Sequence, residues 1–215
     1  MKYARSLTVS AVFVLIAVGV AAWLYPQLPA EVPTHWNIHG QVEGYMPRFW
    51  GAAMAPLMIV GLAILMVLLP LISPRKFEIE PFARVYTTLM LAAQGFMLVI
   101  GVVVLAAGAG YAVRVPFVVM LAVGVLFMVL GNYMGKLRRN FFMGIRTPWT
   151  LASDAVWERT HRMGGWAFML GGAVLVIGTL AGDMLWSLAI AIAIAVVAPV
   201  AYSFVIYRRL EGRHQ

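Results

Sequence analysis

Six apolar segments, each long enough to cross a lipid bilayer, constrain the fold of this chain more than any other feature. A hydrocarbon layer of roughly 30 Å needs about 20 apolar residues in a helix that rises about 1.5 Å per residue. Such segments occur at 7–25, 51–72, 85–107, 115–131, 164–181 and 184–207. Only 11% of the residues are charged, against about 25% in soluble domains. The sequence therefore predicts an all-α polytopic integral membrane protein, a single membrane domain over residues 1–215 with six transmembrane helices.

Lysine and arginine are distributed unevenly over the segments that connect these helices. If the N-terminus lies in the cytoplasm, the cytoplasmic segments hold 14 of the 16 Lys and Arg, and the outer loops hold only Arg48 and Arg114. Loops rich in Lys and Arg stay on the cytoplasmic side of a membrane. We therefore expect a multi-pass protein of the cell inner (cytoplasmic) membrane with both termini cytoplasmic, an extracytoplasmic Pro-rich loop at 26–50 and a cytoplasmic loop at 132–163.

The net charge of +8 does not by itself indicate nucleic-acid binding. In a membrane protein, basic loops set the topology and contact anionic lipid. The lipid bilayer is therefore an expected partner, and we expect no direct contact with nucleic acid.

The predicted spans carry few groups suited to chemistry. No Asp, Glu, Lys, Arg or His lies well inside any of them, whereas ion-coupled transporters usually place such groups at mid-membrane. Gln94 is the one strongly polar interior residue, and it serves either in an interhelical hydrogen bond or in substrate contact. The absence of cysteine excludes disulfides, thiol catalysis and zinc–thiolate sites. We therefore expect no enzymatic activity and no cofactor. Small residues at close spacing, as in Gly131-x-x-x-Gly135 and Gly178-x-x-x-Gly182, allow close helix packing.

The outer loop holds two histidines four residues apart, His35 and His39. On a helix they would share a face and bind a metal, with Glu31 or Glu43 as a third ligand. Four prolines in the loop forbid a continuous helix. In addition, Trp36 occupies the position that glutamate takes in a His-Glu-x-x-His protease motif. We therefore expect a packed lid without a bound metal.

The cytoplasmic loop contains two helix starts. Thr147-Pro148 is one, and Ser153 followed by Asp154 is the other, from which a helix runs into the fifth span. Such a helix places Glu158 and Arg162 as an i,i+4 ion pair, and it places Trp157 and His161 on one face. The loop is either an amphipathic segment held by anionic lipid or a docking site for a cytoplasmic partner.

The stretch from Asn132 to Arg162 resembles the signature of the SdpI-type immunity protein family. The positions that match this signature are Asn132, Asn140, Gly144, Arg146, Thr147, Pro148, Trp149, Thr150, Leu151, Ser153, Val156, Trp157, Thr160, His161 and Arg162. The outer stretch is similar to a second element of the same family through Pro33, His35, Trp36, Asn37 and Gly40. The two elements cover about a quarter of the chain, and the six-span layout matches over its whole length.

This resemblance implies a non-catalytic immunity and signalling protein that protects a cell from a secreted peptide toxin. In the best-known member of the family, the protein also holds a transcriptional repressor at the membrane when toxin is present. The implied cytoplasmic contacts with a ligand or partner are Asn140, Gly144, Arg146, Thr147, Pro148, Trp149, Trp157, Thr160, His161 and Arg162. The implied extracytoplasmic ligand contacts are His35, Trp36, Asn37 and Gly40.

We predict in particular that Arg146, Trp149, Trp157 and His161 form one cytoplasmic surface. Two other functions remain open. The first is a small permease or exporter, which the missing intramembrane charges disfavour. The second is a membrane-embedded metalloenzyme that uses His35 and His39.

Overall fold

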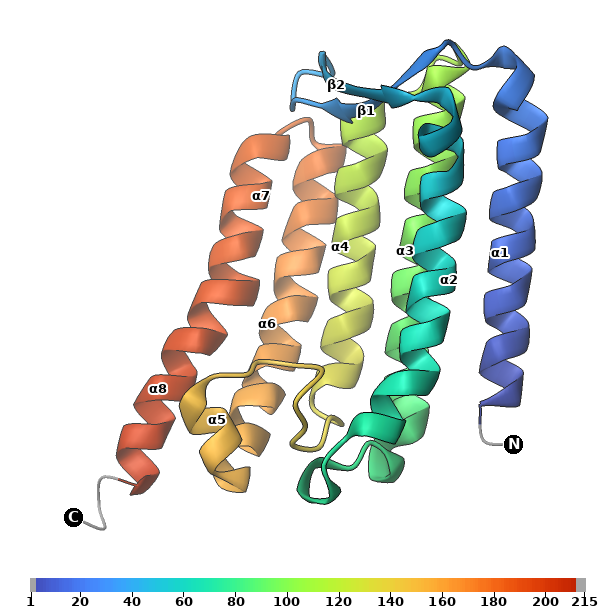
Figure 1. Ribbon diagram of the computed structural model, residues 1–215. Helices are drawn as coiled ribbons and strands as arrows, with labels where there is room; N and C mark the ends of the chain where they lie inside the picture. The colour runs from blue at the N-terminus through green and yellow to red at the C-terminus, as the bar shows by residue number, and fades with distance from the viewer. Residues whose placement is uncertain (1–2, 212–215) are drawn as a thin grey trace. The chain divides into compact units, whose positions relative to one another are not determined.

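Long apolar helices account for most of the chain in the computed structural model, which describes residues 3–211. The helices are α1 (Ala4–Leu24), α2 (Arg48–Ile72), α3 (Ala83–Gly108), α4 (Val115–Met134), α5 (Pro148–Ala152), α6 (Asp154–Leu180), α7 (Met184–Ile192) and α8 (Ala198–Glu211). Short 3₁₀ turns lie at Tyr25–Gln27, Arg75–Phe77 and Glu80–Phe82, and a π-helical turn at Ala193–Val197 joins α7 to α8. Two strands, β1 (Glu31–Trp36) and β2 (Val42–Pro47), complete the elements (Figure 1).

Six helical stretches within residues 3–211 are long and apolar enough to cross a membrane. They are Ala4–Gln27, Arg48–Ile72, Glu80–Gly108, Val115–Met134, Asp154–Leu180 and Met184–Leu210. The prediction of an all-α, six-span membrane protein is therefore confirmed. An even number of crossings returns the chain to the side on which it starts, and the assignment of that side to the cytoplasm stays a prediction.

The chain divides into two compact units. The first comprises Met1–Val67 and Met90–Ala122, and the second comprises Leu68–Leu89 and Val123–Gln215. Each of α2, α3 and α4 contributes residues to both units. The Pro-rich outer loop belongs to the first unit and the loop after α4 belongs to the second, so the two predicted contact regions fall in different units.

The outer loop forms an antiparallel hairpin, which the sequence analysis did not predict. Val32 fastens it to the first unit, because its side chain is completely buried beside Gly51 of α2 and Gly108 of α3. A Cβ atom at Gly51 would lie 3.1 Å from the Val32 Cβ atom, so only glycine leaves normal room for this approach. The apolar cluster around Val32 includes Ala21, Leu24, Leu28, Ala52 and Leu105.

The turn of the hairpin is organised by Asn37. Its side-chain oxygen accepts hydrogen bonds from the backbone N–H groups of His39 and Gln41, both at 3.0 Å. Its amide nitrogen donates to the side chains of Gln41 at 2.8 Å and Glu43 at 3.1 Å. Gly40 takes the left-handed conformation that the turn requires, with φ of +81°. The lid is therefore a hydrogen-bonded hairpin.

Helix α6 packs closely on its neighbours in the second unit because glycines line two of its faces. A Cβ atom at Gly131 of α4 would lie 2.7 Å from the Gly165 carbonyl oxygen, and one at Gly172 would lie 2.5 Å from the Gly124 carbonyl oxygen. On another face, a Cβ atom at Gly171 would lie 3.0 Å from the Ala191 carbonyl oxygen of α7. Backbones that approach this closely gain van der Waals contact in lipid, where the hydrophobic effect does not drive helix association.

Of the two small-residue patterns in the sequence, only the first glycine of each lies in a close helix contact. Gly131 meets α6, and a Cβ atom at Gly178 would overlap Ser187 of α7. Gly135 has room for a side chain, and Gly182 forms the tight turn before α7 with φ of +89°.

Candidate functional site

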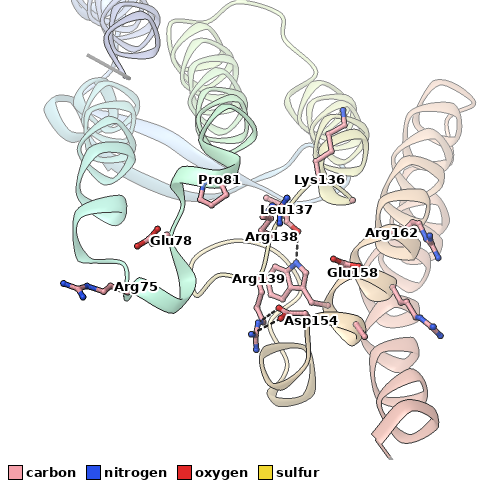
Figure 2. Close-up of a pocket in the computed structure, with 14 residues that line it drawn as sticks. Arg75, Glu78, Pro81, Lys136, Leu137, Arg138, Arg139, Asp154, Glu158 and Arg162 are labelled. Carbon is pink, nitrogen blue, oxygen red and sulfur yellow. Dashed lines mark hydrogen bonds and ion pairs between the residues drawn. The ribbon is translucent and has the colours of Figure 1, made fainter.

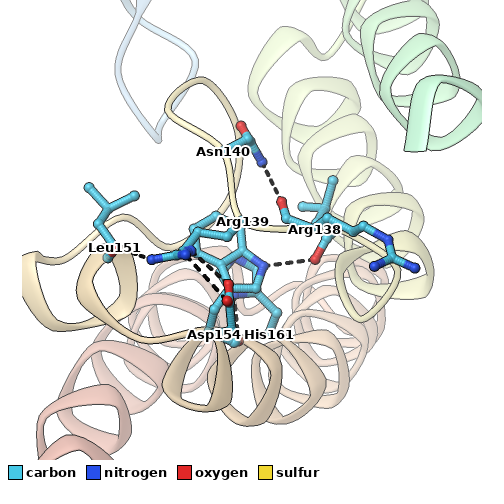
Figure 3. A network of polar contacts seen from close by, with 8 residues as sticks. Arg138, Arg139, Asn140, Leu151, Asp154 and His161 are labelled. Atoms are coloured by element: carbon cyan, nitrogen blue, oxygen red, sulfur yellow. Dashed lines mark hydrogen bonds and ion pairs between the residues drawn. The ribbon is translucent and has the colours of Figure 1, made fainter. Parts of the chain in front are cut away.

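Asn140 holds the loop between α4 and α5 in shape from inside. Its side chain is completely buried, and its oxygen accepts hydrogen bonds from the N–H groups of Phe142 and Met143, both at 2.8 Å. Its amide nitrogen donates to the carbonyl oxygens of Arg138 at 2.9 Å and Met143 at 3.2 Å. Figure 3 shows the Asn140 amide directed at the Arg138 carbonyl. One side chain therefore satisfies four hydrogen bonds, which fixes the sharp bend.

His161 connects this bend to α6. Its Nε2 atom accepts a hydrogen bond from the Ile145 N–H at 2.9 Å, and its Nδ1 atom lies 2.9 Å from the Trp157 carbonyl oxygen, to which it donates. A carbonyl can only accept, so the proton is on Nδ1 and the ring is neutral. Gly144 lies directly against this ring with φ of +100°, and a Cβ atom there would overlap Nε2. Glycine is therefore required at Gly144 both by backbone conformation and by space.

Trp157 packs against His161 in the interior of the same region. Its ring stacks on the His161 imidazole with centroids 3.9 Å apart and planes 19° apart, which confirms that the two residues share a face. Its Nε1 atom donates to the Leu137 carbonyl oxygen at 2.7 Å, which ties α6 to the chain just after α4. We call Asn140, Trp157 and His161 the buried hub.

The helix start at Thr147-Pro148 is confirmed, and α5 begins there with a reciprocal cap. The Thr150 N–H donates to Thr147 Oγ1 at 3.3 Å, and the Thr147 N–H donates to Thr150 Oγ1 at 2.8 Å. Proline at the first helical position costs no hydrogen bond, because that N–H has no partner within a helix. The second predicted start is also confirmed, since α6 begins at Asp154 with Ser153 as its N-cap residue.

Trp149 fastens α5 to α8. Its Nε1 atom donates to Ser203 Oγ, and its ring meets the Phe204 ring edge-on with centroids 5.3 Å apart. Arg146, by contrast, is exposed and uses its guanidinium to donate to the Phe141 carbonyl oxygen within its own loop.

Arg139 and Asp154 form a bidentate ion pair at the start of α6. The Arg139 Nε atom lies 2.7 Å from Asp154 Oδ1, and its Nη2 atom donates to Oδ2 at 3.2 Å. Its Nη1 atom also donates to the Leu151 carbonyl oxygen at 2.7 Å, which satisfies the C-terminal end of α5 (Figure 3). The guanidinium lies 5.3 Å from the centroid of the Phe77 ring, which in turn packs against Phe141. The sequence alone does not reveal this pair, because nothing in the spacing of Arg139 and Asp154 sets them apart from other charges.

A cavity of about 1020 Å³ lies beside this ion pair, entirely within the second unit. Figure 2 shows that its wall comes from three parts of the chain: residues 75–81 after α2, residues 135–139 after α4, and the first turns of α6. The lining residues are Arg75, Glu78, Pro81, Gly135, Lys136, Leu137, Arg138, Arg139, Asp154, Ala155, Trp157, Glu158, Arg159 and Arg162. The cavity is therefore strongly basic, and Arg162 is the exposed member of the predicted contact set that reaches it.

The predicted cytoplasmic contact residues divide into two groups. Asn140, Trp157, Thr160 and His161 are at most 1% exposed, so they offer almost no surface to a ligand or partner. Gly144, Arg146, Pro148 and Arg162 are exposed, while Thr147 and Trp149 are half-buried.

The prediction that one surface contains Arg146, Trp149, Trp157 and His161 is therefore wrong, because Trp157 and His161 are buried. The predicted ion pair between Glu158 and Arg162 is also not formed in the described part of the chain. Contact by the exposed residues remains a prediction.

The outer residues lie together on the hairpin. His35 and His39 are exposed, Trp36 and Asn37 are half-buried, and Gly40 is exposed in the turn. Across residues 3–211, no group of three His, Cys, Asp or Glu side chains is placed to hold a metal ion.

The hairpin and the loop before α6 both lie in segments that match known protein families. Residues 136–203 match the SdpI/YfhL protein family, and residues 12–60 match a domain of unknown function, DUF1648. The chain is 24% identical over 209 residues to the Immunity protein SdpI of Bacillus subtilis (strain 168), an alignment that covers 95% of this chain and 97% of that protein. No solved structure matches the chain. The family match begins in the basic cavity wall and contains the caps, Trp157, His161 and α6, so this part of the chain is similar to the SdpI/YfhL protein family.

Proposed function

We propose that this chain is a non-catalytic membrane immunity protein that gives its cell resistance to a secreted toxic peptide. The observation that carries the proposal is the end-to-end similarity to the Immunity protein SdpI, which extends over 95% of this chain. Both regions with dense, specific contacts, the hairpin and the loop before α6, lie within matched segments. A protein retained for lipid anchoring alone would not need two such loops.

The placement of His161 supports a function without catalysis. This histidine is completely buried, and both of its ring nitrogens are already bonded to backbone groups. A general acid or base must reach the proton that it transfers, directly or through one water. His161 is therefore a structural member of the buried hub, which keeps α6 in register with the loop.

The hairpin is the face that we assign to the secreted peptide. The Lys and Arg distribution predicts that this loop lies outside the cell. Its turn is held by four Asn37 hydrogen bonds, and Val32 fixes its base to the first unit. A rigid turn binds with a smaller loss of conformational entropy than a mobile loop does. His35 on β1 and Gly40 in the turn are exposed and available for contact.

The loop after α4 is the face that we assign to a cytoplasmic regulator such as a transcriptional repressor. Its exposed residues Arg146 and Pro148 follow Ile145, whose N–H is held by the buried hub through His161. A specific partner should require the planar fork of Arg146, which lysine does not provide. The test is capture of cytoplasmic proteins by affinity-tagged chain from cross-linked cells, with and without the peptide fraction. Loss of a captured protein in Arg146→Lys, at unchanged membrane abundance, supports the proposal; identical capture by both chains contradicts it.

The direct test of immunity uses deletion of the gene followed by complementation. The probe is the peptide fraction of culture medium from the parent strain and from neighbouring strains. We expect the deletion strain to die at a dose that the parent survives, and the intact chain to restore survival. Equal survival of the deletion and parent strains over all fractions would show that the chain is not an immunity protein.

A second candidate function, a small permease or exporter, is favoured by one observation. Gln94 of α3 is completely buried, and neither its side-chain nitrogen nor its oxygen has a hydrogen-bond partner among the described residues. An unpaired amide in hydrocarbon is costly, so such a group marks a place where a polar solute or another helix binds. Substitution Gln94→Leu should stabilise an immunity protein against thermal unfolding and leave peptide resistance intact. Loss of resistance without loss of stability would favour transport.

A further inference from the structure

We propose that the basic cavity beside the Arg139–Asp154 ion pair binds the phosphate-bearing headgroup of an anionic phospholipid. The proposal goes beyond immunity and does not depend on it. It rests on three properties of the cavity: its excess of positive charge, the absence of partners within residues 3–211 for the guanidinium groups of four of its five arginines, and its position at the ends of two membrane-spanning helices.

The charges on the cavity wall do not balance. The wall carries six cations and three carboxylates. Arg139 and Asp154 neutralise each other in the bidentate pair, and the ammonium of Lys136 lies 4.8 Å from the centroid of the Tyr133 ring. The two remaining carboxylates, Glu78 and Glu158, are exposed and do not close an ion pair with the cavity arginines in the described structure.

Four arginines consequently present guanidinium groups that make no hydrogen bond or ion pair to any residue within 3–211. They are Arg75, Arg138, Arg159 and Arg162. A guanidinium presents five N–H donors in a planar fork, which matches phosphate oxygens with two parallel hydrogen bonds. Four such groups around one opening therefore favour a phosphate-bearing ligand over a single carboxylate.

A lone inorganic phosphate would fill only a small part of the cavity. Its volume of about 1020 Å³ lies at the upper end of the roughly 300–1000 Å³ that ligand pockets usually have. A phospholipid headgroup, with its glycerol and a second polar group or second phosphate, uses far more of this space.

The position of the cavity selects lipid as the source of the phosphate. Its wall includes Gly135 through Arg139, which directly follow the last residue of α4, and the first turns of α6, and both helices are long enough to span a membrane. Headgroups lie at the level where such helices leave the hydrocarbon. Basic pockets between transmembrane helices on the cytoplasmic side bind anionic headgroups in this way. The aromatic pair of Phe77 and Phe141 borders the same wall and offers apolar surface next to the headgroup.

The test is native mass spectrometry of the purified chain in neutral detergent, titrated with phosphatidylglycerol and, in parallel, with phosphatidylcholine. The cavity variant is Arg138→Gln with Arg162→Gln. The matched control is Arg208→Gln with Arg209→Gln, which removes the same charge from exposed positions of α8 outside the cavity. Each cation near a surface is expected to contribute about fivefold to binding of an anionic lipid, so the cavity variant should bind phosphatidylglycerol about 25-fold more weakly.

Two further titrations distinguish the sources of the anion, and both use the parent chain. Glycerol phosphate represents a soluble phosphate, and a short polyglutamate peptide represents an acidic protein segment. We expect neither to compete at concentrations at which phosphatidylglycerol saturates the site. Equal loss in the cavity and α8 variants, equal binding of the two lipids, or competition by either soluble anion would overturn the proposal. The pair Arg75→Gln with Arg159→Gln probes the same cavity if the first variant unfolds, as judged by circular dichroism.

Discussion

Replacing Asn140 should release the loop that carries the family signature. Asn140 is completely buried and makes four hydrogen bonds, two as acceptor from N–H groups and two as donor to carbonyl oxygens. Asn140→Ala removes all four and leaves the N–H groups of Phe142 and Met143 without an acceptor. Asn140→Asp keeps the acceptor but places a carboxylate against the carbonyl oxygens of Arg138 and Met143. We therefore expect aspartate to be no better than alanine.

The magnitude follows from the number of hydrogen bonds lost. A hydrogen bond within a protein contributes about 0.5–1.5 kcal/mol net, so loss of four lowers the free energy of opening the loop by about 2–6 kcal/mol, and we take about 3.5 kcal/mol as a working value. Because 1.4 kcal/mol corresponds to a factor of ten, the open loop becomes roughly 300-fold more populated. Asn37 supplies the control, since its side chain also makes four hydrogen bonds but at an exposed turn, where water replaces them.

The assay is limited trypsin digestion of the purified chain in detergent, with cleavage after Arg146 followed by mass spectrometry. Cleavage requires local opening, and its rate follows the open population when closing is fast. Asn140→Ala and Asn140→Asp should accelerate this cleavage by about two orders of magnitude, since the rate rises with the open population, while Asn37→Ala leaves it at the parental rate. A parental cleavage rate in both Asn140 variants would refute the reasoning that the buried amide closes the loop.

Three further predictions follow from glycine packing and from charge. Gly144→Ala should destabilise the chain more than Gly182→Ala by at least 2 kcal/mol in thermal or detergent unfolding, since both residues have positive φ but only the first lies against a buried ring; equal losses would contradict this. Gly172→Leu should abolish folding into the six-span form, as size-exclusion chromatography would show, because no side chain fits between α4 and α6; a monodisperse, parent-like peak would contradict it. In intact cells an impermeant thiol reagent should label Gln41→Cys but not Ala152→Cys, since the parent has no cysteine; the reverse pattern would invert the proposed topology.

Hydrophobic length and turn chemistry made much of the fold predictable from sequence. A run of about 20 apolar residues has one stable form in lipid, so the spans follow from composition alone. Thr147-Pro148 predicted the start of α5, because capping is a local interaction. Helix α6 also begins where Ser153-Asp154 predicted, although the Ser153 side chain makes no capping hydrogen bond. That Trp157 and His161 share a face followed from their spacing of four residues on a helix.

The remainder depended on contacts between residues far apart in the sequence. The hairpin was missed because its bulged strands are short and rich in proline, and Val32 of β1 is fixed by glycines of α2 and α3. Burial of Trp157 and His161 was missed because a polar, aromatic stretch is equally suited to a surface and to a buried hydrogen-bonded hub. The partner of His161 is the Ile145 N–H, sixteen residues away, which periodicity does not reveal. The same holds for the Arg139–Asp154 pair and the cavity beside it.

The central claim is that the chain protects its cell from a secreted peptide without destroying that peptide. The most direct measurement exposes deletion cells and complemented cells to the same peptide fraction, and then assays the spent medium on fresh deletion cells. The proposed function predicts that complemented cells survive while their spent medium still kills fresh deletion cells at the original dose. Survival that does not depend on the chain would contradict immunity, and spent medium that has lost its toxicity would contradict protection that leaves the peptide active.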